Sequence, residues 1–384
     1  MNTPDRKLTP AEIDAFGAEL DALRARTVAK LGEEDAKYIR NIVRTVRYTE
    51  VAGRALLMAG IFPPAWILGT LSLGVSKIIE NMELGHNVMH AQYDWMNDPE
   101  LNGQTYEWDT ACTADHWRQT HNYEHHTYTN VMGKDHDIGY GVLRLFPEQK
   151  WEPRFLANPV MALVLMTLFQ HLLALQSLQL EKLLSREKTF AEVKEQAKPI
   201  LKKMRKQVAK DYLLFPALAG PFFPIVFAGN VGANLIRNFW SSAIIFCGHF
   251  TEDAEVFPLE SLENESRGHW YLRQLKGSSN LEGNKLMHIM SGNLSHQIEH
   301  HLFPDVPGRR YAEMSVEVRE ICKRYGQHYN SKPFFKQLGE VAGRILRYSL
   351  PNKPSSDKPS SGKKAAAKKS SQVVREREAE LVAA

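Results

Sequence analysis

The chain has 384 residues, and its 48 basic and 44 acidic side chains leave a net charge of +4, so overall charge says little about partners and we expect no nucleic-acid partner. Three cysteines (Cys112, Cys247 and Cys322) are too few for a disulfide framework or for the four thiolates that an iron–sulfur cluster usually takes. Neither a P-loop nor a G-x-G-x-x-G fingerprint is present, which argues against a fused nicotinamide or flavin domain.

The N-terminal region, residues 1–44, is charged and is expected to be a cytosolic amphipathic segment. Thr9 is placed to cap a helix over residues 9–47, with Pro10 at its first position and Glu12 in its first turn. The start of the chain lacks the apolar run of a signal peptide. Basic residues are frequent just before the first apolar stretch, so the positive-inside rule predicts that this end lies in the cytoplasm.

Four apolar stretches have about the ~20 residues that a membrane span needs. We expect spans at about 45–62, 64–84, 211–229 and 231–249. Pro63 and Pro64 then lie near the turn between the first two spans. Arg54 and Lys77 fall inside these spans, where they either snorkel to the surface or face the bundle interior. One long, kinked, buried helix is the alternative to the first two spans.

A fifth apolar segment, residues 155–180, is constrained by topology. If two spans precede His86 and two more precede His249, both histidines face the same side of the membrane. A complete fifth span between them would separate them, so we expect residues 155–180 to form a helix that lies in the interface or re-enters. The charged residues 181–210 are expected to form a solvated or headgroup-facing helix.

The C-terminal end divides by composition. Residues 336–350 are expected to end the last helix, and the Lys/Ser/Ala/Pro-rich residues 351–384 are expected to form a disordered tail. A plain solvated tail is the more common meaning of such a segment, and weak attraction to anionic lipid is the alternative.

Histidines gather in three short motifs that flank the apolar stretches. The motifs are His86-x-x-x-His90, His121-x-x-x-His125-His126 and His300-His301. On a helix, the i, i+4 spacing stacks two imidazoles on one face, and a following histidine turns to the adjacent face. Imidazole suits iron, zinc or copper, and so many nitrogens exceed the three or four ligands of one zinc site. The pattern therefore favours a pair of metal ions.

Three acidic residues, Asp94, Asp135 and Asp137, lie close to the first two motifs. A carboxylate in such a place often holds a ligand imidazole through its second nitrogen. Solvated surface acids are an alternative of equal weight.

The order H-x-x-x-H (86–90), H-x-x-x-H-H (121–126) and Q-x-x-H-H (297–301), with the run HQIEHHLFP, resembles the integral-membrane fatty-acid desaturases. It is most similar to the actinobacterial acyl-CoA desaturases of the linoleoyl-CoA/stearoyl-CoA type, from about residue 40 to about 335. The runs KDHDIGYG, IIFCGHF and HWYLRQL add to the likeness. The resemblance implies an all-α integral membrane fold: a desaturase domain over residues 45–335 with four transmembrane helices and a helical cytosolic cap that holds two non-haem iron ions.

The resemblance implies that the motif histidines are the iron ligands: His86, His90, His121, His125, His126, His300 and His301. In the family a further ligand histidine follows the fourth span, and His249 matches it, although Ile245 stands where the animal stearoyl-CoA enzymes have an asparagine. Gln297 also departs from the pattern, because many relatives have a histidine there. Imidazole is a better ligand than an amide oxygen, so we expect His296 in the ligand set, with Gln297 close behind. The remaining histidines are expected not to be ligands: His116, His136, His171, His269, His288 and His328.

The resemblance also implies the reaction. With O2 as co-substrate, a cis double bond is introduced into a long-chain acyl-CoA of the Δ9 stearoyl or palmitoyl type. Two electrons must come from outside, and the chain has neither a cytochrome b5 motif nor ferredoxin cysteines, so a separate ferredoxin and an NADPH-dependent reductase are the expected partners, besides membrane lipid. The implied location is the bacterial inner (cytoplasmic) membrane, with the active site facing the cytoplasm.

Three other functions remain open at this point. A di-iron hydroxylase of fatty acids or alkanes shares the second motif and the metal chemistry. A desaturase of lipid-linked acyl chains shares the reaction. A membrane metal transporter or sensor belongs to a different class, and its histidines would line a path through the bilayer rather than lie at the ends of spans.

Overall fold

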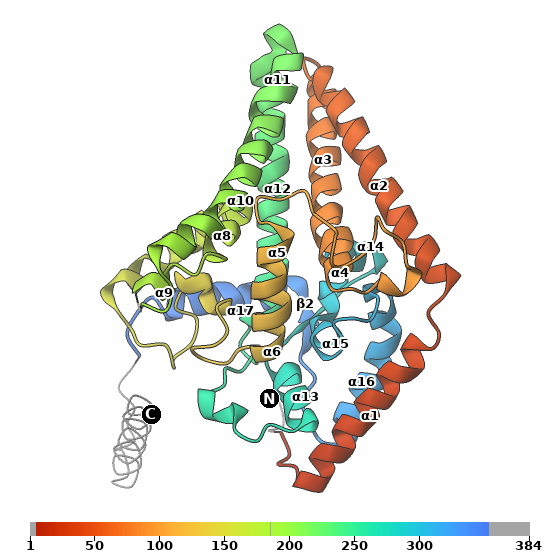
Figure 1. The fold of residues 1–384 in the computed structure, drawn as a ribbon, viewed down its shortest axis with the longest axis vertical. Coiled ribbons are helices and arrows are strands. Elements are labelled where there is room, and N and C mark those ends of the chain that lie inside the picture. Colours follow the sequence, from red (N-terminus) through yellow and green to blue (C-terminus); the bar gives the residue numbers. More distant parts are fainter. Residues whose placement is uncertain (1–4, 185, 353–384) are drawn as a thin grey trace. The chain divides into compact units, whose positions relative to one another are not determined.

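The computed structural model describes residues 5–184 and 186–352, so the tail expected over 351–384 lies almost wholly outside the described residues. Within that part the chain is mainly helical (Figure 1). Two short strands, β1 (Asn280–Glu282) and β2 (Ser331–Pro333), pair in parallel with Asn280 opposite Ser331.

The helices fall into long, short and irregular classes. The longer α-helices are α1 (Pro10–Val28), α2 (Glu33–Met58), α3 (Pro63–Ile79), α10 (Phe190–Ala209), α12 (Phe223–His249), α16 (Tyr311–Arg324) and α17 (Phe334–Arg347). The shorter ones are α4 (His86–Met89), α5 (Ala114–Trp117), α6 (His126–Tyr128), α7 (Asn158–Thr167), α8 (Phe169–Gln176), α9 (Glu181–Leu184), α11 (Phe215–Leu218), α13 (Arg267–Lys276), α14 (Lys285–Met290) and α15 (Gln297–Leu302). The π-helices are η1 (Glu80–Gly85), η3 (Arg118–His125) and η6 (Lys210–Leu214). The 3-10 turns are η2 (Asp94–Met96), η4 (Ile138–Gly141), η5 (Pro153–Ala157), η7 (Gly220–Phe222), η8 (Leu259–Leu262), η9 (Leu294–His296) and η10 (Gly308–Arg310).

The predicted cap of the first helix is confirmed. The Thr9 hydroxyl accepts a hydrogen bond from the backbone N–H of Glu12 at 3.3 Å, and the Glu12 carboxylate accepts from the backbone N–H of Thr9 at 2.9 Å. The single helix expected over 9–47 is wrong, because the chain breaks before Gly32, which begins α2 in an extended conformation. Helix α2 then continues to Met58, so residues 1–44 and the first expected span are not separate helices.

Helices α2, α3 and α12 pack against one another, and glycines permit their close approach. A Cβ on Gly53 of α2 would lie 2.7 Å from the backbone nitrogen of Leu73 in α3. A Cβ on Gly229 of α12 would collide with a methyl carbon of Leu57 in α2. Small residues at helix crossings allow such contacts. The turn expected at Pro63 is confirmed, since α3 begins there and runs through η1 into α4 without a break.

The boundary between the third and fourth expected spans is wrong. Helices α10, η6 and α11 follow one another to Leu218, and the reversal lies at residues 219–222, where Gly220 has a φ of +55°. Residues 223–229 therefore belong to α12. Gly229 and Gly232, which lie where the third and fourth expected spans meet, face Leu57 and Thr70 in helix–helix contacts instead.

The apolar residues 155–180 do not form one helix. Helices α7 and α8 meet at an angle of 101° near Leu168. The side-chain N–H of Asn238 donates to the carbonyl oxygen of Thr167 at 2.7 Å, and a side chain that binds a backbone carbonyl in this way commonly accompanies a helix break. Among the described helices, none is by itself long and apolar enough to cross a membrane, and only this bent pair passes that test jointly.

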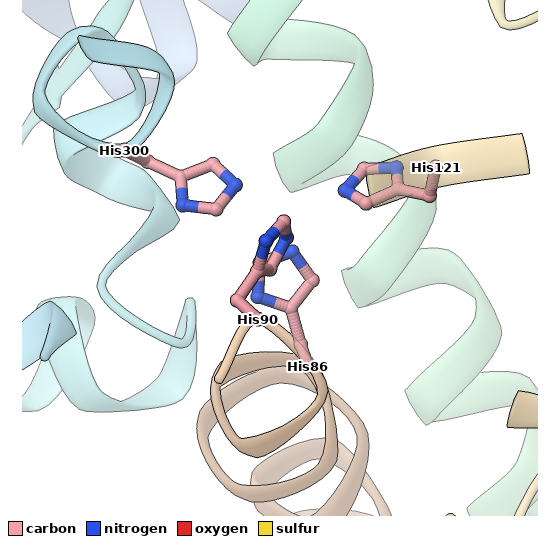
Figure 2. A group of neighbouring side chains, drawn as sticks. All are labelled: His86, His90, His121 and His300. Atoms are coloured by element: carbon pink, nitrogen blue, oxygen red, sulfur yellow. The ribbon is translucent and has the colours of Figure 1, made fainter. Parts of the chain in front are cut away.

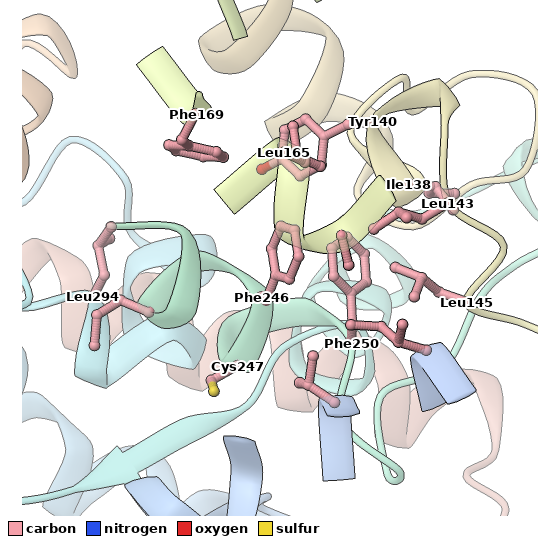
Figure 3. Close-up of a cluster of buried hydrophobic side chains, with 14 of the residues drawn as sticks. Ile138, Tyr140, Leu143, Leu145, Leu165, Phe169, Phe246, Cys247, Phe250 and Leu294 are labelled. Carbon is pink, nitrogen blue, oxygen red and sulfur yellow. The ribbon is translucent and has the colours of Figure 1, made fainter. Parts of the chain in front are cut away.

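Two of the hydrophobic clusters include neighbours of the site histidines in the sequence. In the first, Phe246 of α12 and Phe250, just after its end, pack with Tyr140 and Leu145 (Figure 3). In the second, α1 packs on α13, α15 and α16 through a cluster that includes Phe16 and Phe303. Packing in these clusters fixes the end of α12, which carries His249, and helix α15, which carries His300 and His301.

Candidate metal centre

Eight imidazoles from four parts of the chain converge on one region. Their ligand atoms form three overlapping groups, each within 4.8 Å: His86, His90, His121 and His300; His125, His249 and His301; and His126, His300 and His301. The second and third groups share His301, and the first and third share His300. The arrangement is therefore one continuous nitrogen-rich centre with room for more than one ion.

Irregular helices present the first two motifs. The π-helix η1 leads directly into His86, and the π-helix η3 contains both His121 and His125. A π-helix has i to i+5 hydrogen bonds, is rare, and occurs frequently at functional sites. Here it stacks the rings of His121 and His125, whose centroids are 5.1 Å apart with 23° between their planes.

In the first group, His86 and His90 project from one helix between His300 and His121 (Figure 2). The Nε2 atoms of all four are buried and have no hydrogen-bond partner among the described residues. Burial and the neighbouring imidazoles lower the pKa of His86 to about 3 and hold the pKa values of the other three well below the usual range. Neutral imidazoles with a free Nε2 lone pair are the form that binds a metal ion.

The second group places two ring nitrogens very close together. The Nε2 atoms of His249 and His301 are 3.1 Å apart. The Nδ1–H of His249 donates to the carbonyl oxygen of Gly277, and the Nδ1–H of His301 donates to the Gln274 amide oxygen, both at 3.0 Å. Both Nε2 atoms then carry lone pairs that face each other, which is unfavourable without a cation. Two nitrogens each ~2.1 Å from one cation lie ~3.0–3.4 Å apart, close to the spacing seen here.

His126 links the two groups. Its ring stacks on that of His301, with centroids 4.4 Å apart and 12° between the planes. Both of its ring nitrogens are buried and without a hydrogen-bond partner among the described residues. A buried imidazole that satisfies neither nitrogen is costly, and a metal ion removes that cost.

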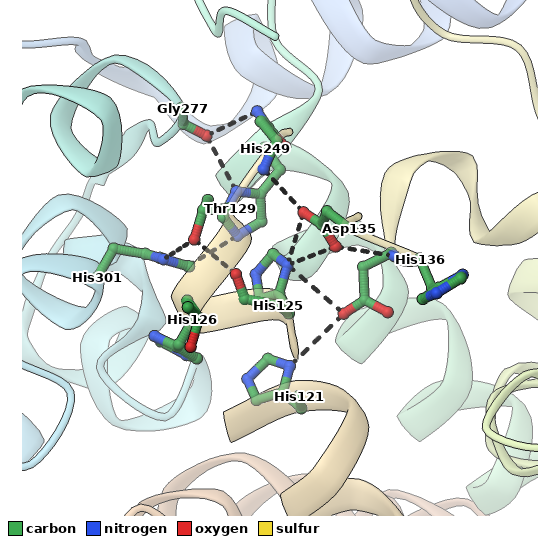
Figure 4. A network of polar contacts seen from close by, with 12 residues as sticks. His121, His125, His126, Thr129, Asp135, His136, His249, Gly277 and His301 are labelled. Atoms are coloured by element: carbon green, nitrogen blue, oxygen red, sulfur yellow. Dashed lines mark hydrogen bonds and ion pairs between the residues drawn. The ribbon is translucent and has the colours of Figure 1, made fainter. Parts of the chain in front are cut away.

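A carboxylate holds His125 in place (Figure 4). The Nδ1 of His125 lies 3.0 Å from Oδ2 of Asp135, which also accepts a hydrogen bond from the backbone N–H of Asn130. Burial opposes a charge on the ring, but the negative charge of Asp135 and its hydrogen bond outweigh burial and raise the pKa of His125. Asp137 lies farther away, 3.6 Å from Nδ1 of His121. A carboxylate at Nδ1, as Asp135 is for His125, orients the ring and leaves Nε2 to face a metal ion.

Of the three acids noted in the sequence, Asp135 is thus a support for a candidate ligand, whereas Asp94 accepts from the backbone N–H of Gly103. The sequence did not predict the other partners of the Nδ1 atoms. These are Gln274 for His301, the carbonyl group of Gly277 for His249, and Tyr311, whose hydroxyl lies 3.4 Å from Nδ1 of His300. The run HWYLRQL contains Gln274, but no local pattern marks it as a partner of His301.

The third motif differs from the expectation that favoured His296. His296 ends the 3-10 turn η9, stacks on His288 with centroids 4.6 Å apart, and belongs to none of the candidate metal groups found among the described residues. Gln297 begins α15 and therefore shares a face with His300 and His301, three and four residues later. Its amide nitrogen lies 2.8 Å from Nε2 of His249, and its amide oxygen is buried without a partner.

The six histidines expected not to be ligands lie outside these groups, as far as the described residues show. The residues present fit a pair of transition-metal ions: the donors are mostly neutral imidazoles, several of their lone pairs have no partner, and a carboxylate, an amide and a carbonyl group hold the second nitrogens. Gln297 adds an amide oxygen that has no hydrogen-bond partner among the described residues.

A largely apolar cavity adjoins the centre. His86, His121, His125 and His249 line one part of it. Aromatic and aliphatic side chains form much of the remaining wall: Trp108, Trp117, Tyr140, Phe169, Leu173 and Phe250. A chemically reactive metal centre would therefore face an apolar ligand.

Comparison with known proteins agrees with this geometry. A family model described as "Fatty acid desaturase" matches residues 61–333. The chain is 45% identical over 350 residues to the "NADPH-dependent stearoyl-CoA 9-desaturase" of Mycobacterium tuberculosis (strain ATCC 25618 / H37Rv), covering 90% of this chain and 82% of that protein. It is 25% identical to the "sn-1 linoleoyl-lipid 6-desaturase" of Synechocystis sp. (strain ATCC 27184 / PCC 6803 / Kazusa), over 86% of this chain and 91% of that one.

A human protein, "Fatty acid desaturase 3", is 24% identical over 76% of this chain and 64% of its own length. The family match covers more than half of the chain and includes all eight clustered histidines. The resemblance recognised in the motifs is confirmed, and the chain belongs to the fatty acid desaturase family.

Proposed function

We propose that the protein is an O2-dependent acyl-CoA desaturase that introduces a cis double bond at the Δ9 position of a stearoyl- or palmitoyl-type chain. The observation that carries the proposal is the joining of the eight-histidine centre to an apolar cavity. The substrate class follows from the printed name of the M. tuberculosis relative and from its 45% identity over most of both chains.

The proposed cofactor is a pair of non-haem irons held by His86, His90, His121, His125, His126, His249, His300 and His301, with Gln297 beside them. When bound, they supply the activation of O2, which takes up two external electrons and two protons and removes one hydrogen from each of two adjacent methylenes, yielding two waters. The protein's own part is to hold the imidazoles in fixed orientations. Asp135, Gln274 and the Gly277 carbonyl group do this at the Nδ1 atoms.

The cavity walls position the substrate. An acyl chain gains ~0.8 kcal/mol for each methylene moved from water to an apolar surface. Trp117 lies against His86 and His121, with ring centroids 5.4 and 4.5 Å away, so one cavity wall is continuous with the ligand set. A chain that fills the cavity would bring defined methylenes beside the metals and exclude water from them.

The family is generally membrane-associated, and we propose four membrane-spanning segments built on α2, α3, α10–α11 and α12, with α7 and α8 re-entering. Support comes from large apolar side chains that are exposed on these helices: Ile67, Leu68, Leu71, Val160, Leu163, Leu213, Leu214, Leu218, Phe227 and Phe239. Such exposure marks surfaces that contact lipid or another protein. The basic N-terminal helices favour the inner membrane with the centre on the cytoplasmic side.

The electron donor is proposed to be a separate ferredoxin with an NADPH-dependent reductase. The chain's three cysteines are buried in three different hydrophobic clusters, which leaves no cysteine cluster of its own among the described residues. The M. tuberculosis relative is named as NADPH-dependent. Desaturation of lipid-linked chains and hydroxylation are less favoured, because the M. tuberculosis relative, at 45% identity, is named for a CoA-linked substrate and for desaturation.

The test is turnover by the iron-loaded protein with O2, a reductase–ferredoxin pair and stearoyl-CoA. Loss of two mass units from the acyl chain supports the proposal, and a gain of sixteen identifies a hydroxylase. His125→Ala is expected to abolish turnover and to lower bound iron. His116→Ala is the matched control and should retain both, because the His116 imidazole hydrogen-bonds the Thr113 hydroxyl and lies outside the candidate groups found among the described residues. Full activity of His125→Ala would refute the proposed centre.

A further inference from the structure

The inner end of the acyl cavity is polar and carries a buried cation. Along α12 the cavity lining begins at Arg237 and continues through Asn238, Ser241 and Ile245 to His249, and on the segment leading to His86 it begins at Asn81. No residue earlier in α12 or α3 lines the cavity. The cavity therefore extends from the histidine centre to the level of Arg237 and ends there.

Arg237 is 2% exposed, and its hydrogen bonds go to neutral amides. Its side chain donates to the amide oxygens of Asn238 at 2.9 Å, Asn81 at 3.2 Å and Asn234 at 3.2 Å. No carboxylate forms an ion pair with it among the described residues, and two of its five N–H donors have no protein acceptor there. A buried cation in this state is costly to maintain and is a functional-site candidate in a membrane protein.

Two further polar atoms at this end lack partners. The hydroxyl oxygen of Ser241 and the amide oxygen of Gln170 line the cavity, are buried, and have no hydrogen-bond partner in the described chain. Ser241 is one helical turn from Arg237, and Gln170 lies just after the bend between α7 and α8. That bend is itself tied to the cavity end, because Asn238 donates to the carbonyl oxygen of Thr167.

Asn234 links Arg237 to a buried group of charged side chains. Asn234 binds Arg237 through its oxygen and Asp211 through its nitrogen, at 3.2 and 3.0 Å. Asp211 in turn forms ion pairs with Lys77 at 2.7 Å and Arg54 at 3.2 Å. Asp211 thus pairs directly with two other cations, and it acts on Arg237, like Asp109 and Glu80, only from beyond ion-pair distance.

Resting on the proposed function, we infer that Arg237, with Asn81, Asn238 and Ser241, forms a polar end wall that fixes how many carbons of the acyl chain fit beyond the reacting methylenes. A methylene placed in the apolar part of the cavity strengthens binding about fourfold. A terminal methyl pressed against the wall gains nothing and displaces the groups that would solvate the guanidinium. Binding therefore improves with length only until the chain meets Arg237.

The length of the cavity agrees with this role. Along helices rising ~1.5 Å per residue, His86 to Asn81 spans ~8 Å and His249 to Arg237 spans ~18 Å. An extended carbon chain with ~1.5 Å bonds advances ~1.3 Å per carbon, so on the order of ten carbons fit between the centre and the wall. An eighteen-carbon chain desaturated at position 9, the reaction named for the M. tuberculosis relative, leaves eight carbons beyond its double bond.

The experiment measures binding and turnover separately, with saturated acyl-CoAs from about 12 to about 24 carbons and the detergent-purified, iron-loaded protein. Binding is read from the fluorescence of the tryptophans, since Trp108 and Trp117 line the cavity. The wild type should bind more tightly with each two-carbon step and then lose affinity abruptly. Arg237→Met should move that limit to longer chains by at least two carbons. Arg54→Met is the matched control, because Arg54 belongs to the same ionic cluster but does not line the cavity, and it should leave the limit unchanged.

A second arm compares two ligand series and can be read in the wild type alone. At or just beyond the chain length where wild-type affinity falls, an acyl-CoA with a terminal hydroxyl should bind the wild type at least fourfold more tightly than its methyl-ended analogue of equal length. Arg237→Met should lose this preference. Equal binding of the two series, together with an unchanged limit in Arg237→Met, overturns the end wall. A length limit in binding without any desaturation would refute the proposed function and leave the wall supported. If Arg237→Met does not fold, the hydroxyl series in the wild type decides.

Discussion

Nδ1 of His125 lies 3.0 Å from the Asp135 carboxylate, so one of the central candidate ligands depends on a residue ten positions later in the chain. The carboxylate also accepts from the backbone N–H groups of Asn130 and Asp137 at 2.8 and 2.9 Å, which fixes its orientation. Supporting residues of this kind commonly affect metal affinity by ~10–100-fold.

Asp135→Asn should therefore weaken iron binding by about 10–100-fold and reduce turnover in proportion, because the neutral amide no longer favours the oriented Nδ1–H tautomer. Iron content after dialysis against graded chelator measures the change. Asp94→Asn is the matched control, since Asp94 contacts Gly103 rather than an imidazole. Unchanged iron affinity in Asp135→Asn would contradict the role assigned to this carboxylate.

The choice between Gln297 and His296 can be decided by two alanine variants. Gln297→Ala should lower iron occupancy, because the amide lies 2.8 Å from Nε2 of His249 and its oxygen has no other partner in the described chain. His296→Ala should retain iron, because His296 packs on His288 away from the candidate groups. Iron per protein, measured by elemental analysis, separates them, and the reverse result would restore His296 as the ligand.

A buried ion pair outside the centre gives a pH-dependent prediction. Asp35 of α2 is fully buried and accepts hydrogen bonds from Arg309 at 2.9 Å and from Arg310 at 2.8 and 2.7 Å. Burial alone would raise the pKa of Asp35, but the Arg310 hydrogen bond and the Gly32 N–H outweigh it and lower the pKa from its usual value. Asp35→Asn should therefore lower the free energy of unfolding near neutral pH by ~3–5 kcal/mol, which is seen as a lower melting temperature.

Because the folded pKa lies below the unfolded one, this stabilisation is complete above about pH 4 and is lost as the pH falls through the folded value. The difference in melting temperature between wild type and Asp35→Asn should narrow as the pH drops below 4. Glu34→Gln serves as the control, because the Glu34 carboxylate is exposed and 3.9 Å from Arg309. A constant difference down to pH 3 would argue against an ionised Asp35.

Two glycine-to-alanine changes should have opposite effects on stability. Gly53→Ala should cost ~1–3 kcal/mol, because its Cβ would lie 2.7 Å from the Leu73 backbone nitrogen where α2 crosses α3. Gly343→Ala in α17 should stabilise by up to ~1 kcal/mol, because nothing lies within 4 Å and alanine favours the helix. Thermal unfolding in detergent compares the pair, and a stabilising Gly53→Ala would contradict the crossing.

The sequence by itself determined the parts that depend on neighbours in the chain. The Thr9 cap, the start of α3 at Pro63 and the i, i+4 pairing of His86 with His90 follow from local spacing and backbone chemistry, and the motifs alone identified the family. Only the tertiary structure decided which glycines turn the chain and which permit helix contact, because a glycine in a turn and a glycine at a helix crossing look alike in the sequence. It likewise placed Gln297 rather than His296 beside His249, and brought Asn81 to Arg237 across 156 residues, since these relations depend on how α12 packs against its neighbours.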